Sequence, residues 1–191
     1  MFKTQELILK RMSKSEHEAF CAADFSDLDN PKMISKSLEL LEDDGYILRA
    51  RRGIYYKNNV ESFDPLEVAL AIGRSNNWVV APCGDYALYL VGLHDENFSN
   101  YSFVSTGPYG FYDLVDEILE FKHSTCKSLP NISTNILIVI QAIKELGKER
   151  INEKIIAVLK NFLSEKEKQE IIKGEFSITV WIQNILNTIA S

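Results

Sequence analysis

The stretch PKMISKSLELLEDDGYILRARRGIYYK, residues 31–57, decides the fold of the first third of this chain. Its first half predicts a helix over 31–44, because the apolar residues Ile34, Leu38 and Leu41 recur at helical spacing. Gly45 is suited to the left-handed conformation that often ends a helix. Two β-like runs follow at 46–50 and 54–57, joined by a tight turn. A helix followed by a basic hairpin is typical of the second half of a winged helix-turn-helix.

The residues before this stretch have the order that such a domain needs. Apolar residues at helical spacing predict a first helix over 2–12, followed by a short extended piece over 18–21. A helix of one or two turns is expected over 22–28. Asn30 is placed as an N-cap, with Pro31 at the first position of the third helix. We therefore predict a winged helix-turn-helix DNA-binding domain over residues 1–60.

Length and composition exclude several classes of protein. A chain of 191 residues can bury a proper core as one or two domains. No apolar run approaches the roughly 18–20 residues that span a bilayer, and the first residues lack an apolar leader core. The three cysteines are widely spaced without a CxxC pair, which argues against a zinc site or disulfides. We expect a cytoplasmic protein without membrane association, metal or other cofactor.

Charge is unevenly distributed along the chain. Residues 1–60 hold ten basic and ten acidic residues, so the second part carries the whole net charge of −6. A DNA-binding protein with an acidic total needs its positive charge concentrated locally. The hairpin supplies that concentration with Arg49, Arg51, Arg52 and Lys57.

The predicted DNA-binding residues fall into two groups. The first turns of the third helix enter the major groove in helix-turn-helix proteins, so this part of the chain is expected to contact bases. The basic hairpin is expected to anchor phosphates or reach the minor groove. The complete set is Lys32, Ser35, Lys36, Arg49, Arg51, Arg52, Tyr55 and Lys57. Two alternatives remain open: an ordinary amphipathic helix with a solvated lysine face, and a winged helix used only as a protein–protein adaptor.

The remainder, residues 64–191, predicts a second domain of mixed α and β structure with a helical C-terminal part. Asp64 and Pro65 begin a helix, and short strands are expected at 78–81 and 101–106 around a helix at 85–93. The segment 111–123 fits a helix or a hairpin about equally well. Helices are expected at 134–146, 152–163, 164–173 and 178–189. The overall fold class is therefore α+β.

A metal-dependent nuclease is the alternative enzymatic interpretation. Asp113 or Asp116, followed by Glu120 and Lys122, has a D…ExK spacing in which two carboxylates hold a divalent cation. The spacing is short, and a solvated hairpin with alternating charges explains it equally. Isolated histidines and Cys83 have no catalytic partner at local spacing. We therefore predict that the chain is not an enzyme.

The chain resembles the short AbiEi-type antitoxins, the DNA-binding half of type IV toxin–antitoxin and abortive-infection systems. In the first domain the matching residues are Asp24-Phe25, Leu38, Leu41, Gly45, Ile47, Arg49 and Arg52-Gly53-Ile54-Tyr55. In the second they are Pro82, Gly84, Tyr86-Ala87, Gly92-Leu93, Thr106-Gly107-Pro108, Phe121-Lys122-His123 and Leu146-Gly147-Lys148. The family usually has basic residues late in the third helix, where this chain has Leu40 and Asp44. That departure shifts the expected phosphate contacts to the hairpin.

The resemblance implies a transcriptional autorepressor that binds an inverted-repeat operator in the double-stranded DNA of its own operon. Such a repeat leaves room for a homodimer on DNA. It implies a role as the antitoxin in phage defence, against a nucleotidyltransferase-like toxin with which it forms no stable complex. It also favours a hairpin over residues 111–123. The operator sequence, the oligomeric state, the antitoxic mechanism and the presence of an adjacent toxin gene are not visible in the sequence.

Overall fold

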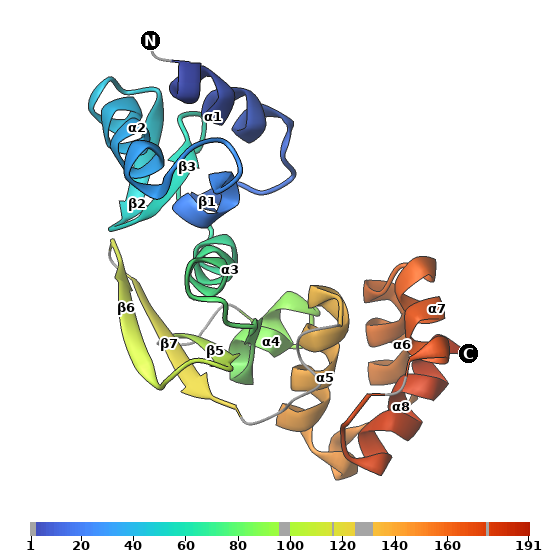
Figure 1. Cartoon of the computed structure of the whole chain (residues 1–191). Coiled ribbons are helices and arrows are strands. Elements are labelled where there is room, and N and C mark those ends of the chain that lie inside the picture. The colour runs from blue at the N-terminus through green and yellow to red at the C-terminus, as the bar shows by residue number, and fades with distance from the viewer. Residues whose placement is uncertain (1–2, 96–99, 116, 125–131, 175) are drawn as a thin grey trace. The chain divides into compact units, whose positions relative to one another are not determined.

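A computed structural model describes residues 3–95, 100–115, 117–124, 132–174 and 176–191 (Figure 1). The fold is α+β, as predicted, and combines helices with two separate sheets. The chain forms two compact units. The first consists of Met1–Trp78 with Phe111–Leu119, and the second of Val79–Gly110 with Glu120–Ser191.

The first unit has the expected order of elements. They are α1 (Lys3–Lys14), β1 (Ala19–Cys21), a 3-10 turn η1 (Ala22–Phe25), α2 (Pro31–Asp43), β2 (Ile47–Arg51), β3 (Ile54–Lys57) and α3 (Pro65–Asn76). β3 lies between β1 and β2 and pairs antiparallel with both. The sequence therefore predicted the extended piece before η1 correctly, and pairing with β3 is what makes it a strand.

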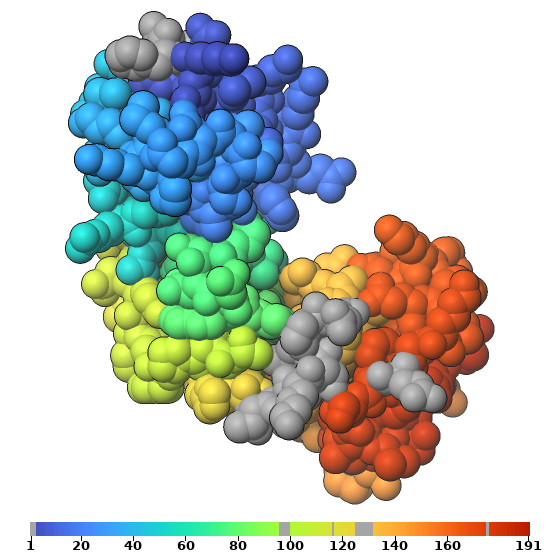
Figure 2. Space-filling view, in the orientation of Figure 1, coloured from blue at the N-terminus to red at the C-terminus, as the bar shows by residue number. Residues whose placement is uncertain are grey.

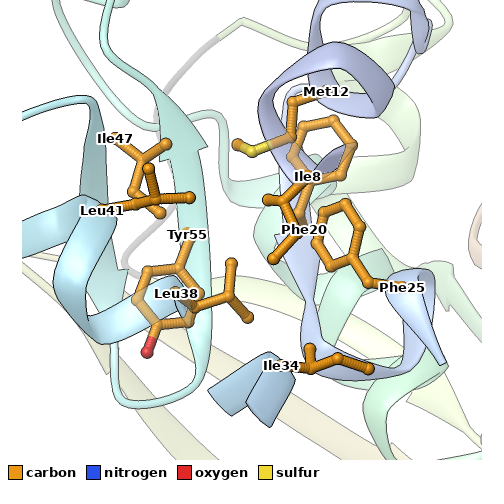
Figure 3. Packing of buried hydrophobic residues seen from close by; sticks show 9 residues of the cluster. All are labelled: Ile8, Met12, Phe20, Phe25, Ile34, Leu38, Leu41, Ile47 and Tyr55. Atoms are coloured by element: carbon orange, nitrogen blue, oxygen red, sulfur yellow. The ribbon is translucent and has the colours of Figure 1, made fainter. Parts of the chain in front are cut away.

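The core of this unit is an apolar cluster that joins α1, α2 and the sheet (Figure 3). Figure 3 shows Leu38 and Leu41 of α2 facing Ile47 and Tyr55 of the hairpin. Each fully buried side chain of this kind contributes about 1.5–3 kcal/mol to folding. The remaining members of the cluster are Ile8, Met12, Phe20, Phe25 and Ile34. One side of α2 is thus fixed against the domain, and its opposite side is left to solvent.

Both ends of α2 are set by local signals in the sequence. The Asn30 side chain accepts a hydrogen bond from the backbone N–H of Met33 at 3.0 Å, and Pro31 follows at the first helical position. At the other end, Gly45 has φ +73°, and the N–H of Tyr46 donates to the carbonyl of Leu41 at 2.9 Å. This left-handed ending turns the chain directly into β2.

The β2–β3 hairpin contains an irregularity that the sequence did not reveal. Arg49 pairs with Tyr55 and Arg51 with Ile54, so β2 has one extra residue, a β-bulge, at Ala50. A bulge increases the local twist and redirects the side chains that follow it. Gly53 closes the turn with φ +79°, a conformation that glycine adopts without strain.

Helix α3 belongs to the first compact unit, although we expected a domain boundary at residues 60–64. The guanidinium of Arg74 donates to Asp24 from Nε at 2.8 Å and to the carbonyl of Ala19 from Nη2 at 2.7 Å. The carboxylate of Glu67 accepts from the backbone N–H groups of Glu18 and Ala19. Helix α3 therefore covers β1 and η1, and the compact unit extends to Trp78.

The rest of the described chain contains a second sheet, of order β4-β5-β7-β6, and a set of helices. Its elements are β4 (Val80–Pro82), α4 (Gly84–Leu90), β5 (Tyr101–Ser105), β6 (Gly110–Leu114), β7 (Glu117–His123), α5 (Thr134–Leu146), η3 (Lys148–Arg150), α6 (Glu153–Phe162), α7 (Glu165–Lys173) and α8 (Val180–Ala190). The ambiguous segment 111–123 is thus a hairpin, as the resemblance favoured. Residues Phe111–Leu119 of this hairpin group with the first unit, and the residues from Glu120 onwards group with the second.

The apolar helix α5 is the centre of the second unit. Ile136 to Ile143 are all buried, and α5 packs on α4, β4, α7 and α8. Helices α6 and α7 both contact α8, and Figure 1 shows the three grouped together. In the part of the chain that the structure describes, no helix is long and apolar enough to cross a membrane.

Candidate nucleic-acid interface

The exposed side of α2 carries the three groove residues predicted from the sequence. Lys32, Ser35 and Lys36 are all exposed, while Ile34 and Leu38 are 1% exposed and face the core. The space-filling view shows the segment around residues 30–45 at the surface of the first unit (Figure 2). The first two turns of α2 therefore present two ammonium groups and a hydroxyl on a helix that packing holds in place.

The lysines on this surface are weakly engaged. Lys36 Nζ lies 3.9 Å from Glu39 Oε2, with both side chains more than half exposed. Exposed ion pairs of this kind contribute about 0–1 kcal/mol, so a phosphate can replace the carboxylate at little cost. Lys32 forms no ion pair with another described residue. Both cations are available to an anionic ligand.

Arg52 lies at the turn of the β2–β3 hairpin and is exposed. It precedes Gly53, whose positive φ forms the turn, and it forms no ion pair with an acidic residue in the described ranges. A guanidinium in this position can donate two parallel hydrogen bonds to one phosphate. Arg52 is thus the member of the predicted hairpin group whose placement agrees best with phosphate binding.

Arg49 connects the hairpin to α2. Its Nη1 lies 3.5 Å from Glu42 Oε2, and its guanidinium carbon is 6.0 Å from the centre of the Tyr55 ring. The side chains of Arg49 and Glu42 are 38% and 31% exposed, so the pair remains accessible to water. Arg49 can exchange Glu42 for a phosphate, and it lies on the side of the hairpin that faces α2.

Arg51 is placed differently from its neighbour Arg52. Its guanidinium carbon lies 4.6 Å from the centre of the Tyr112 ring, and the side chain is half-buried. Burial lowers the pKa of Arg51, while the neighbouring Tyr112 and Asp113 act in the opposite direction. We had expected Arg51 to extend from the hairpin turn towards phosphates. In the structure its side chain lies against Tyr112 instead.

Tyr55 and Lys57 have structural contacts that their predicted roles did not include. Tyr55 is 5% exposed and packs in the core, where burial raises its pKa. Lys57 Nζ donates to the carbonyl of Ser15 at 3.0 Å and lies 5.9 Å from the centre of the Phe20 ring. Tyr55 thus supports α2 and Arg49, and Lys57 ties the end of β3 to the end of α1.

The residues of the nuclease alternative have other contacts. Glu120 accepts a hydrogen bond from Ser102 Oγ at 2.9 Å and pairs with Lys122 at 3.4 Å. Asp113 is exposed, and Asp116 lies outside the described residues. Among the described residues no group of three or more His, Cys, Asp or Glu side chains is arranged to hold a metal ion. Burial raises the pKa of Cys83 to about 11, so its thiol stays protonated at neutral pH.

Two residues that matter to this surface were missed by sequence reasoning. Arg74 anchors α3 to η1, and Tyr112 covers Arg51, yet each is distant along the chain from its partner. Hydrophobic periodicity and turn signals report local structure only. Neither contact leaves a signal of that kind in the sequence.

Comparison with known proteins places the chain in a family but does not assign an activity. A search of the curated proteins finds no match. The model of a family of unknown function, DUF6088, matches residues 6–171. Since this match covers both compact units and most of the chain, the protein belongs to the DUF6088 family.

Proposed function

We propose that the first unit is a winged helix-turn-helix that binds double-stranded DNA through α2 and the β2–β3 hairpin. The observation that carries the proposal is the exposed face of α2, where Lys32, Ser35 and Lys36 lie opposite a fully buried apolar stripe. A helix held in this way can enter a major groove with these side chains leading.

The hairpin supplies the second half of the proposed interface. Arg52 at the turn and Arg49 beside α2 would contact phosphates and set the position of α2 in the groove. Carboxylates of the protein compete little with phosphates for these two arginines. The Arg49–Glu42 pair is partly exposed, and Arg52 has no acidic partner among the described residues. Of the predicted residues, Lys57 and Tyr55 would act indirectly by holding the hairpin and α2 in place.

The wider role that we propose is that of a transcriptional autorepressor and type IV antitoxin. It rests on the resemblance to AbiEi-type antitoxins, and the placement of the matching Arg52-Gly53-Ile54-Tyr55 segment in a hairpin turn and strand is compatible with it. The proposed partners are an inverted-repeat operator in the chain's own promoter DNA and a nucleotidyltransferase-like toxin. The proposed toxin is tested by expressing the neighbouring open reading frame alone and together with this chain. Growth that is arrested by the first and restored by the second would support the antitoxin role.

DNA binding is tested by titrating a fluorescent duplex from the region upstream of the gene at several salt concentrations. Each phosphate contact contributes about 0.9 to the slope of log affinity against log salt. We expect Lys32→Ala/Lys36→Ala to lower the slope by up to about 1.8 if both lysines bind phosphate. We expect Arg52→Ala to lower the slope by about 0.9. Lys154→Ala removes an exposed lysine of α6 and serves as the matched control, with no expected change.

Two results would contradict the proposal. If the wild-type chain shows no salt-dependent affinity for any duplex, the adaptor alternative is favoured. If it binds DNA but the α2 and Arg52 variants bind with the affinity and slope of Lys154→Ala, another surface makes the contacts. DNA cleavage that depends on Mg²⁺ and on Lys122 would support the nuclease alternative instead.

A further inference from the structure

Arg51 and Arg52 are adjacent in the sequence but have different surroundings in the first unit. Arg52 is exposed, whereas the guanidinium of Arg51 lies over the Tyr112 ring, 4.6 Å from its centre. Arg51 Nη1 is buried and has no hydrogen-bond partner among the described residues. Tyr112 is part of Phe111–Leu119, the segment of the β6–β7 hairpin that groups with this unit.

The ring of Tyr112 stabilises the charge of Arg51, but the buried Nη1 of Arg51 has no hydrogen-bond acceptor among the described residues. A cation over an aromatic face is stabilised by the ring's charge distribution, and the effect grows when the pair is shielded from water. A buried N–H of a charged group without an acceptor, however, is unfavourable. A phosphate would give the guanidinium the acceptors that the tyrosine ring lacks, in the paired geometry that arginine favours.

We propose that Tyr112 is an autoinhibitory residue, which holds Arg51 away from DNA in the free protein and releases it to a phosphate on binding. This inference rests on the proposed DNA-binding function. The bulge at Ala50 supports it, because it redirects β2 between Arg49, which pairs with Glu42, and Arg51, which lies over Tyr112. Arg52 would make the first contact with DNA, and Arg51 would follow once it leaves Tyr112.

The opposite interpretation is that Tyr112 positions Arg51 for DNA. In that case the donor atoms of the guanidinium should be open to a ligand. Nη1 is instead buried, and the nearby carboxylate of Asp113 stabilises the positive charge of Arg51. The contact therefore competes with an anionic ligand, and removal of the ring should strengthen DNA binding.

The test measures the affinity of full-length variants for the same duplex at about 150 mM salt, near physiological ionic strength. We expect Tyr112→Leu, which keeps an apolar side chain but removes the aromatic face, to bind about 2- to 30-fold more tightly. This range corresponds to a cation–π contact of about 0.5–2 kcal/mol. Tyr112→Phe keeps the ring and should bind like wild type. In an Arg51→Ala background, Tyr112→Leu should give no gain.

The outcomes separate the two proposals. If wild type binds no duplex, the proposed function fails and the autoinhibitory role fails with it. If wild type binds in a salt-dependent way but Tyr112→Leu is unchanged or weaker, the autoinhibitory role alone is refuted. A gain that persists without Arg51 also refutes it, because the ring would then act through another group. Thermal unfolding of each variant shows whether a change in affinity reflects loss of structure.

Discussion

The ion pair between Asp24 and Arg74 joins η1 to α3, and its removal should destabilise the first unit. The carboxylate of Asp24 accepts from Arg74 Nε at 2.8 Å and Nη2 at 3.3 Å, and from the backbone N–H of Cys21 at 2.8 Å. The side chains of Arg74 and Asp24 are 27% and 17% exposed. Asp24→Ala therefore leaves the largely buried guanidinium of Arg74 with the Ala19 carbonyl as its one acceptor among the described residues. It also removes the acceptor of the buried Cys21 N–H.

The expected loss in the free energy of unfolding for Asp24→Ala lies between the values for a buried and an exposed ion pair. Breaking a fully buried ion pair costs about 3–5 kcal/mol, and a fully exposed pair contributes about 0–1 kcal/mol. Loss of hydrogen bonds to a charged group costs about 1.5–3 kcal/mol. For this partly exposed pair we expect a loss of about 2–3 kcal/mol in the free energy of unfolding. With a urea m-value of about 2 kcal/mol/M, the midpoint should fall by about 1–1.5 M.

The assay is urea unfolding followed by tryptophan fluorescence. The chain has two tryptophans, Trp78 in the first unit and Trp181 in the second. A Trp181→Phe background leaves Trp78 as the reporter of the first unit. The matched control is Asp27→Ala, because Asp27 pairs with Arg11 at 2.5 Å but is 66% exposed. We expect the control to lower the midpoint only slightly, because water screens this exposed pair.

The reasoning would be refuted if both substitutions lowered the midpoint equally. Equal losses would mean that the hydrogen bonds of Asp24 add nothing beyond those of an exposed pair. Asp24→Asn provides a second check, since it keeps an acceptor for Cys21 but removes the charge. Its midpoint should lie between those of wild type and Asp24→Ala.

Three further changes test local features of the first unit. Asn30→Ala removes the cap of α2 and should cost about 1 kcal/mol in urea unfolding, whereas Asn30→Asp should restore most of it. Gly53→Ala has open space for its methyl group but φ +79°, so thermal unfolding should show a loss of about 1 kcal/mol from backbone strain alone. Arg11 hydrogen-bonds to Asp27 and lowers the pKa of that carboxyl to about 2. The stabilisation by this ion pair is present above the unfolded pKa of about 3.9 and is lost as pH falls towards 2. Because the pair is exposed and screened by water, Asp27→Asn should flatten that part of the acid-unfolding curve only slightly.

The helices and turns were predictable because their signals are local. Asn30 and Pro31 begin α2, Asp64 and Pro65 begin α3, and Gly53 forms the hairpin turn, each within a few residues of the structure it sets. Apolar periodicity identified the buried stripe of α2, and therefore also the side that stays exposed. The segment 111–123 was ambiguous on its own residues, since its apolar pattern suits both a helix and a hairpin.

The amino-acid sequence by itself determined the helices and the β2–β3 hairpin of the first unit, and which cations this unit carries. Only the tertiary structure decided which cations are available: Arg52 is exposed, Lys57 is bound to Ser15, and Arg51 is covered by Tyr112. It also decided that α3 belongs to the first unit, through Arg74. The physical reason is that these contacts join residues 42 to 61 positions apart along the chain, which no local pattern reports. The accessibility of a side chain depends on what the fold packs against it.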